Sequence, residues 1–260
     1  MANKPKNYDL KAADRRRTML IRIGLTAVVI LFAAGLVFWI VTHKKPTDAM
    51  AISASNPTKL VKGADGQPAV VLSLYEDFLC PHCGTFEKNL GPTVHQLIDS
   101  GAVQADYYMV AILDRGSDNY SSRSASAAYC VAEFDTSPTK DAFRRFHDKL
   151  FVQQPSEMAG SYPSNEQLIE MARQAGLASE ELSGCINGEK YIKMVRGLAA
   201  AEGVSSTPTI KINGQTFAFS DATTPEELIA KVTQITGNVP GLPGPAVPSP
   251  PPPAPAPAAP

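Results

Sequence analysis

The sequence has little cysteine and almost no net charge. Four cysteines in 260 residues are too few to replace a hydrophobic core, so a disulfide-dense mini-scaffold is excluded. A collagenous chain is excluded as well. The formal net charge of −1 argues against a nucleic-acid-binding protein that works by positive charge.

Charge and proline are unevenly distributed along the chain. Residues 1–45 carry nine Lys and Arg against two Asp, a balance of +7, whereas residues 46–239 carry fifteen basic and twenty-three acidic residues, a balance of −8. The last 21 residues have no charge and hold eleven of the 22 prolines. Only the middle region, of about 190 residues, has the composition of a domain with a core.

The N-terminal region has the pattern of a membrane anchor. The nineteen residues from Ile23 to Val41 are uncharged and as a helix would span about 28 Å, close to the thickness of a bilayer core. We predict a cytoplasmic segment at 1–22, a transmembrane helix at 23–42 and a linker at 43–55. The basic residues before the helix place the N-terminus inside and the remainder outside the cell membrane.

A cleaved signal peptide is the alternative to an anchor. Ala49-Met50-Ala51 offers a distant cleavage site, although the apolar run is longer than is usual for a signal. Both alternatives export the domain, so its cysteines are expected in an oxidising environment. At the other end, residues 238–260 are predicted to be a disordered, polyproline-rich tail, either a spacer or a docking peptide for a partner.

The first half of the exported domain has an α/β pattern. Residues 69–75 form an apolar run typical of a central strand, and a helix with Pro92 inside it is expected to follow from residue 81 to about 101. A second strand is predicted at 103–112. Strand, helix and strand in this order indicate a right-handed crossover in a mixed or parallel sheet.

The second half begins with helices and returns to the sheet. We predict an all-helical inserted subdomain over 118–203, with helices at about 120–135, 139–152, 164–176 and 189–202. A hairpin through Asn213-Gly214 and a last helix starting at Thr224-Pro225 follow, within the segment 204–237. The segments 56–117 and 204–237 would then complete one sheet.

The chemistry of the sequence is concentrated at Cys80-Pro81-His82-Cys83. A C-x-x-C at a strand-to-helix junction places the first sulfur at a helix N-terminus, where backbone N–H groups and the helix dipole favour an anion. Cys80 is therefore predicted to be the accessible nucleophile with a low pKa, and Cys83 the sheltered resolving thiol. Pro81 suits the first helical turn, and His82 offers a cation beside Cys80.

Two structural interpretations compete with this redox interpretation. Half of a zinc site is one, but Cys130 and Cys185 stand alone, 55 residues apart. A purely structural Cys80–Cys83 disulfide is the other, and it would constrain very little. We expect no metal, and no flavin or nicotinamide fingerprint is present, so the expected redox group is the Cys80–Cys83 pair itself.

Thr207-Pro208 is the second motif with a candidate functional role. A proline at the start of a strand is a place where a cis peptide bond leaves backbone groups free to pair with an extended substrate. A trans proline on an edge strand is the alternative that the residues by themselves leave open.

Taken together, these motifs resemble the DsbA-like branch of the thioredoxin superfamily, over about residues 56–237. Several short stretches of the sequence are similar to the membrane-anchored DsbA-like oxidoreductases of mycobacteria and related actinobacteria. They are YEDFLCPHCGTFE, GPTV, ADYYMVAILD, YSSRSASAAYC, FRRFH and TPT. The resemblance implies a thioredoxin fold with an inserted helical subdomain. It also implies that Cys80 attacks, that Cys83 resolves and that Pro208 is cis beside the active site.

One departure from the family concerns the buried acid near the cysteines. Leu74 occupies the position six before Cys80, which is often acidic in relatives, and Glu76 and Asp77 lie closer to the motif. Either acid is a candidate proton acceptor for Cys83; the alternative is a pair of polar residues in a strand-ending loop. Thr207 before the proline also differs from the enterobacterial relative.

The remaining cysteines and histidines have simpler interpretations. Cys130 and Cys185 both fall in the helical insertion, so a structural disulfide is preferred over two free thiols; its 55-residue loop corresponds to about 4 kcal/mol of stabilisation. His95 and His147 are expected to be surface or helix-face residues, without an assigned partner.

The sequence thus predicts an extracytoplasmic thiol:disulfide oxidase. Its expected substrates are reduced or partly unfolded exported proteins, and its reoxidant, by resemblance, is a quinone-linked membrane protein of the VKOR type or a DsbB-like protein. We expect a monomer and no nucleic acid. The alternatives are a reductase or isomerase of the same fold, and a non-catalytic membrane-tethered binding module.

Overall fold

The computed structural model describes Met19, residues 24–26, residues 51–114 and residues 118–242. The chain divides into two units, Met1–Ala49 and Met50–Pro260. In the first unit, Met19 and residues 24–26 are helical. Within the described residues no helix is both long enough and apolar enough to cross a membrane. The predicted segments 1–22 and 23–42 lie almost entirely outside these residues, so both stay predictions.

The second unit holds a five-stranded sheet with the order β1-β3-β2-β4-β5. β2 and β3 are parallel, and every other neighbouring pair is antiparallel. The strands are β1 (Ile52–Ala54), β2 (Val71–Glu76), β3 (Gln104–Met109), β4 (Thr209–Ile212) and β5 (Gln215–Phe217). The predicted crossover is confirmed, because α2 (Pro81–Asp99) connects the two parallel strands.

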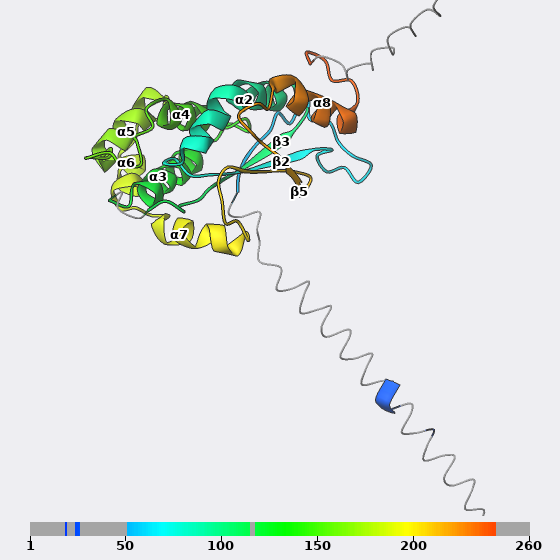
Figure 1. Cartoon of the computed structure of the whole chain (residues 1–260), viewed down its shortest axis with the longest axis horizontal. Helices are drawn as coiled ribbons and strands as arrows, with labels where there is room; N and C mark the ends of the chain where they lie inside the picture. Colours follow the sequence, from blue (N-terminus) through cyan, green and yellow to red (C-terminus); the bar gives the residue numbers. More distant parts are fainter. Residues whose placement is uncertain (1–18, 20–23, 27–50, 115–117, 243–260) are drawn as a thin grey trace, which may run out of the picture. The chain divides into compact units, whose positions relative to one another are not determined.

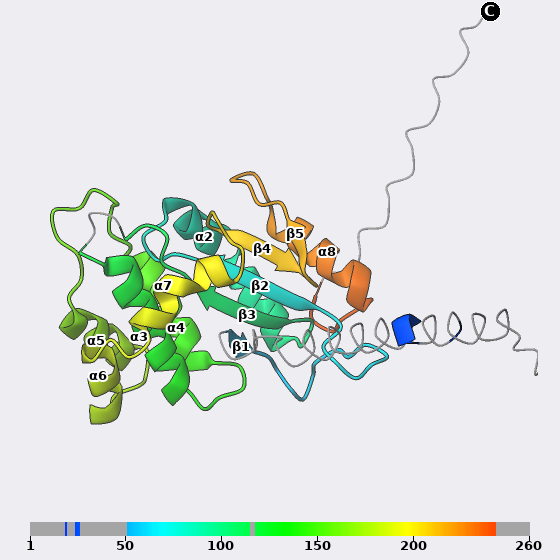
Figure 2. The same cartoon turned by 90° about the horizontal axis from the view of Figure 1, so that it is seen from below.

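The sheet and α2 share one core. Alternate residues of β2 such as Leu72 and Leu74 are fully buried, as expected for a central strand. α2 presents Phe86, Leu90 and Val94 to the core at helical spacing and continues through Pro92. Figure 1 and Figure 2 show α2 and α8 (Pro225–Thr236) together on one face of the sheet, with α7 (Ile192–Ala201) on the opposite face.

Among the residues that the structure describes between β3 and β4 there are five helices, in agreement with the predicted helical insertion. They are α3 (Tyr120–Phe134), α4 (Asp141–Val152), α5 (Asn165–Gln174), α6 (Glu180–Asn187) and α7 (Ile192–Ala201). α3 is the centre of this group and packs against each of the other four. α4 also packs on α2, and this contact brings the insertion beside the C-x-x-C motif.

Local signals explain the elements that close the fold. Asn213 and Gly214 both adopt positive φ, of 49° and 79°, which is the backbone of a two-residue hairpin turn. At α8, the side chain of Thr224 caps the helix in a capping box with Glu227. Pro225 is the first helical residue, as the sequence predicts.

The prediction missed one strand and one helix and placed the start of the tail too early. β1 lies inside the predicted linker 43–55, because a three-residue strand that pairs with β3 is too short to show a periodic pattern. α6 was not predicted, since its eight residues include Gly184; Ser179 caps it. The predicted tail begins too early, because Val239 and Leu242 are buried and Gln96 donates a hydrogen bond to the Gly241 carbonyl.

Candidate active site

Cys80 lies at the N-cap of α2, directly after the loop that leaves β2. Its backbone is extended, with φ of −75° and ψ of 118°, and Pro81 is the first helical residue. The Cys80 carbonyl accepts hydrogen bonds from the N–H groups of Cys83 and Gly84, at 3.0 and 3.2 Å, which closes the first helical turn. The sulfur is therefore held at the positive end of the helix dipole.

The surroundings of Cys80 favour its thiolate. A hydrogen bond from the Cys83 thiol, assisted by the Thr207 side chain and by the backbone N–H groups of Cys83 and His82, lowers the pKa of Cys80 to about 6, although burial opposes the shift. In its protonated form the thiol donates a hydrogen bond to the Thr207 carbonyl at 3.3 Å, a bond that the thiolate does not make. The His82 side chain is exposed, and it is the His82 backbone that acts on the sulfur.

Cys83 has the opposite character. It is fully buried, and burial, the hydrogen bond to Cys80 and the nearby charge of Glu76 raise the pKa of its thiol well above the ordinary value. Both cysteines are free thiols in this structure, and both are buried. The accessible position predicted for Cys80 is therefore wrong, because the residue is only 5 % exposed and the Thr207 carbonyl lies against its sulfur. One sulfur of the pair is thus prepared to carry a negative charge and the other to carry a proton, which is the asymmetry that thiol–disulfide exchange needs.

The loop before β4 completes the neighbourhood of Cys80. The Thr207–Pro208 peptide bond is cis, as the resemblance implies, and the Thr207 carbonyl faces the Cys80 sulfur. On the other side, the Gln154 side-chain amide donates to the carbonyls of Phe78 and Cys80, at 3.1 and 2.9 Å. Gln154 follows α4 and was not expected in the site, because no local motif marks a residue that reaches it through the tertiary fold.

The two acids before the motif occupy different environments. Asp77 accepts hydrogen bonds from the backbone N–H groups of Leu79, Ile112 and Leu113, at 2.8 to 2.9 Å, and so joins the active-site loop to the segment after β3. Burial raises the pKa of Asp77, while those N–H groups partly offset the shift. Glu76 is the acid whose charge acts on Cys83.

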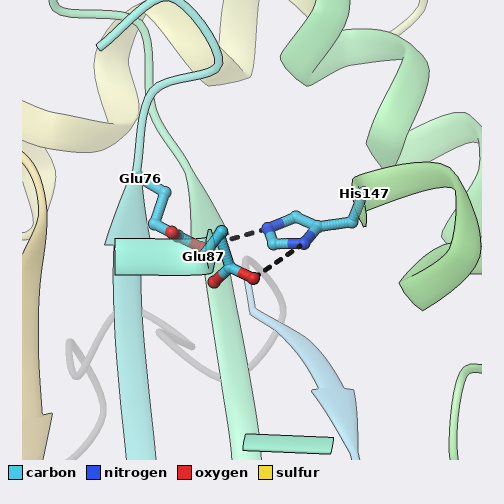
Figure 3. Close-up of side chains that lie close together, drawn as sticks. All are labelled: Glu76, Glu87 and His147. Carbon is cyan, nitrogen blue, oxygen red and sulfur yellow. Dashed lines mark hydrogen bonds and ion pairs between the residues drawn. The ribbon is translucent and has the colours of Figure 1, made fainter. Parts of the chain in front are cut away.

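Glu76 belongs to a buried cluster with His147 and Glu87. Figure 3 shows the imidazole of His147, from α4, beside the carboxyl groups of Glu76 and Glu87. His147 Nε2 lies 3.0 Å from Glu76 Oε2, and His147 Nδ1 lies 3.8 Å from Glu87 Oε2. Burial and repulsion from Glu76 raise the pKa of Glu87 well above its ordinary value. Burial alone would lower the pKa of His147, but the surrounding carboxyl groups outweigh it and raise the pKa.

Of the two positions expected for His147, the surface and a helix face, the structure shows a helix face, and that face of α4 is buried. Its side chain is 0 % exposed and is enclosed by the rings of Phe78, Tyr107, Phe143 and Phe151. The signal was present in α4, because Phe143, His147 and Phe151 recur at intervals of four residues and form one apolar helix face. The buried partner of His147 comes from a strand 71 residues earlier and has no local signature.

Among the described residues, Glu76, Glu87 and His147 are the group able to offer three metal-ligand atoms within 4.8 Å of one another. The two carboxyl groups approach different nitrogens of the ring, Nε2 and Nδ1. A single metal ion binds only one nitrogen of an imidazole, so this arrangement is that of a hydrogen-bonding network rather than of a chelate.

The other two cysteines form a disulfide. Cys130 of α3 and Cys185 of α6 are joined, with their Cα atoms 5.9 Å apart, which is the pairing expected from the sequence. The bond connects the central helix of the insertion to a short peripheral helix. It leaves Cys80 and Cys83 as the free pair.

Comparison with known proteins agrees with this geometry. The family model described as thioredoxin matches residues 55–233. The solved structure of the reduced form of a disulfide bond oxidoreductase, DsbG, from Mycobacterium tuberculosis is similar to this chain, with a TM-score of 0.68. The two sequences are 50 % identical, and the match covers 74 % of this chain and 89 % of that one. Reduced DsbA of the same organism is 48 % identical, with the same TM-score, over 74 % and 95 % of the two chains.

Curated relatives are more distant. Disulfide bond formation protein D of Bacillus subtilis is 26 % identical over 190 residues, which are 71 % of this chain and 81 % of that protein. The chain is also 27 % identical over 143 residues to the serine/threonine-protein kinase PknE of Mycobacterium tuberculosis, and this match spans 54 % of the chain but only 24 % of the kinase. On the family model and the two mycobacterial structures, the chain belongs to the thioredoxin family, among its DsbA-like thiol–disulfide oxidoreductases.

Proposed function

We propose that this protein is an extracytoplasmic oxidase that introduces disulfide bonds into exported proteins through Cys80 and Cys83. The observation that carries the proposal is the contrast between the two thiols, in which the pKa of Cys80 is lowered to about 6 and that of Cys83 is raised. A stabilised Cys80 thiolate favours the reduced form of the pair. The disulfide form is then a better oxidant, and electrons flow from the substrate to the protein.

The exchange proceeds in two steps. A substrate thiolate attacks the Cys80 sulfur of the disulfide, the Cys80–Cys83 bond breaks, and Cys83 leaves as a thiolate that takes up a proton. A second substrate thiolate then attacks the substrate sulfur of the mixed disulfide, and Cys80 leaves as a thiolate. The substrate has lost two electrons and gained a disulfide, while the pair has gained both electrons.

Cys80 and its neighbours suit the two roles of attacked atom and leaving group. The lowered pKa makes Cys80 a good leaving group in the second step. The Thr207 carbonyl beside the sulfur offers a backbone acceptor to an extended substrate, and we assign Thr207 and Pro208 to substrate binding. Pro81 contributes through its place as the first helical residue, and His82 through its backbone N–H group.

The proposed place of action is outside the cytoplasmic membrane. The basic segment 1–22 and the uncharged run within 23–42 support an N-terminal anchor with its N-terminus in the cytoplasm. The Cys130–Cys185 disulfide gives independent support, because structural disulfides persist in oxidising compartments. The proposed substrates are accordingly reduced or partly unfolded exported proteins.

Repeated turnover needs an acceptor for the two electrons that the pair collects. The sequence offers a dithiol and contains no flavin or nicotinamide fingerprint, so we assign reoxidation to a second protein. A quinone-linked membrane protein of the VKOR type is the proposed partner, with a DsbB-like protein as the alternative. Either would accept the electrons from reduced Cys80 and Cys83 by the same exchange chemistry.

The experiment is oxidation of a reduced model protein by the full-length chain. The wild type is expected to form the disulfide of the model protein stoichiometrically, and Cys80→Ser is expected to abolish this reaction. A Cys130→Ser/Cys185→Ser double variant, tested below its unfolding temperature, is the matched control and should keep the activity. Undiminished activity of Cys80→Ser would contradict the mechanism.

A reductase or isomerase of the same fold is the second candidate function. A reductase or isomerase would use the same pair of attacking and resolving thiols, and only the lowered pKa of Cys80 favours the oxidase direction. Reduction of an oxidised model protein, without oxidation of the reduced one, would favour this function. A non-catalytic, membrane-tethered module is the third candidate, and cysteines that fail to react with alkylating agents would favour it.

A further inference from the structure

One side chain of the helical insertion reaches the backbone of the redox motif. Gln154 lies two residues after the end of α4, and its side-chain amide donates hydrogen bonds to the carbonyls of Phe78, at 3.1 Å, and Cys80, at 2.9 Å. Phe78 is fully buried and Cys80 is nearly so, which makes water a poor substitute for this donor. The amide therefore bridges two carbonyl groups, one on each side of Leu79, directly at the nucleophile.

The turn before α2 is held from two directions. Asp77 Oδ1 accepts a hydrogen bond from the Leu79 N–H group at 2.9 Å, and the Asp77 carbonyl accepts one from the Cys80 N–H group, also at 2.9 Å. Asp77 thus binds N–H groups of the turn, while Gln154 binds its carbonyl groups. One of these two residues belongs to the thioredoxin fold and the other to the insertion, so both parts of the domain fix the same turn.

The backbone of Gln154 is itself well restrained. Its N–H group donates to the Phe151 carbonyl at 3.2 Å, and the Phe151 ring packs on the Phe78 ring with the two centroids 5.0 Å apart. Pro155 follows, and a proline restricts the backbone of the residue before it. The amide is therefore presented to the turn by a packed segment with few backbone alternatives.

Gly84 leaves the space that the Gln154 side chain occupies. A Cβ atom added to Gly84 would overlap with Gln154 Oε1. Both residues line a groove of about 740 Å³ between α2 and α4, so a displaced amide has room to turn into this groove. An alanine at position 84 would thus push the amide away from the two carbonyls without a clash against the backbone.

The Cys80 carbonyl connects Gln154 to the reactive sulfur. The same oxygen accepts hydrogen bonds from the N–H groups of Cys83 and Gly84, at 3.0 and 3.2 Å, in the first turn of α2. The backbone N–H groups of Cys83 and His82 in turn help to lower the pKa of Cys80. A rotation of the Cys80 peptide group would therefore change the direction of these N–H groups relative to the sulfur.

We propose that Gln154 is a positioning residue for the nucleophile and holds the turn at Cys80 in the geometry that stabilises the thiolate. It acts through the Cys80 backbone and is therefore not a catalytic residue. The proposal rests on thiol–disulfide exchange at Cys80 and holds for either direction of electron flow. It gives the helical insertion a part in the chemistry of the redox pair, because the segment after α4 supplies the amide.

The test is the titration of the Cys80 thiolate, followed by ultraviolet absorbance in the reduced full-length protein. Gln154→Met removes the donor, keeps an unbranched side chain and changes no charge, so a shift reports the geometry of the hydrogen bonds at the sulfur. We expect the midpoint to rise by about one pH unit, which leaves about fivefold less thiolate at pH 6. Gln153→Met, the same change at the exposed neighbour, should keep the wild-type midpoint.

Gly84→Ala removes the same contact without a change at Gln154. It should raise the midpoint as Gln154→Met does, although alanine is the better helix former. In the background of Gln154→Ala, which makes room for the new methyl group, Gly84→Ala should cause no further shift, because the contact is already absent. A role limited to stability would move the unfolding transition of these variants and leave the thiolate midpoint where it is.

Three outcomes would overturn the proposal. The first is a folded Gln154→Met variant with the wild-type midpoint, even if it unfolds more easily. The second is a pair of additive shifts from Gly84→Ala and Gln154→Ala, because the two residues would then act separately. The third is an equal shift in Gln153→Met, which would assign the effect to the segment and not to the amide. The titration is measured on the protein alone, so its result is separate from the test of the oxidase direction.

Discussion

The buried protons of Glu87 and His147 predict how the stability of the oxidised protein depends on pH. Both pKa values are raised in the native state, so both groups keep a proton that the unfolded chain releases. For His147 the resulting stability is fully present below the unfolded pKa of about 6.5 and is lost as the pH rises through the native pKa. The proton that native Glu87 keeps changes stability in the same direction, because its contribution is lost as the pH rises above about 4.3.

The magnitude follows from the number of protons. Each proton that the native state holds and the unfolded state lacks lowers the free energy of unfolding by about 1.4 kcal/mol per pH unit. His147 keeps such a proton above about pH 6.5, so it contributes a slope of about 1.4 kcal/mol per unit from there up to its native pKa. Glu87 adds to the fall in stability from about pH 4.3 upward until its own native pKa is passed. In the disulfide form Cys80 and Cys83 do not titrate and add nothing to this slope.

Urea unfolding of the oxidised protein at a series of pH values measures the slope. Glu87→Gln removes the carboxyl group whose charge does most to raise the pKa of His147, so stability should fall less between about pH 6.5 and pH 8 than in the wild type. Glu170→Gln, at an exposed glutamate paired with Arg173, should keep the wild-type slope. Stability that is flat or rises between about pH 6.5 and pH 8, or an equal slope in Glu87→Gln, would refute the assigned protonation of the cluster.

Three further predictions test other parts of the site. The Cys80 thiolate, followed by its ultraviolet absorbance in the reduced protein, should appear with a midpoint near pH 6; a midpoint in the ordinary range of free cysteine would contradict the surroundings assigned to the sulfur. Asp77→Ala should lower the free energy of unfolding by about 3 kcal/mol or more, because three backbone N–H groups lose their acceptor, and denaturation that shows no loss would disprove that role. Cys130→Ala/Cys185→Ala should cost about 4 kcal/mol, from its 55-residue loop, with exchange at Cys80 retained below the unfolding temperature; lost exchange in the folded variant would implicate this pair in the chemistry.

The sequence was sufficient to predict the parts of the site that depend on local chemistry. A buried strand that runs into a C-x-x-C places Cys80 at a helix N-terminus, and the backbone there follows from Pro81. The hairpin at Asn213 and the capped helix at Thr224 are equally local, because turn and cap residues fix their own backbone.

The parts that could not be predicted arise from packing between distant segments. His147 and Glu76 are 71 residues apart, and only the contact of α4 with α2 and the sheet brings the imidazole to the carboxyl group. Gln154 reaches the Cys80 carbonyl through the same contact. A histidine in an apolar helix face indicates burial, but its partner depends on tertiary structure that periodicity does not contain.

Short or irregular elements were missed for a different reason. β1 has only three residues, too few for a periodic pattern, and it becomes a strand because it pairs with β3. Val239 and Leu242 lie next to a proline-rich stretch, so composition assigned them to the tail although both are buried.

The direction of electron flow is the central claim, and the reduction potential of the Cys80–Cys83 pair tests it most directly. Equilibration of the full-length protein with glutathione buffers, with the cysteines counted by alkylation, gives this potential. The proposed oxidase predicts a value more positive than about −180 mV, that of protein disulfide isomerase. A value near −270 mV, that of thioredoxin, would contradict it and assign the protein to reduction.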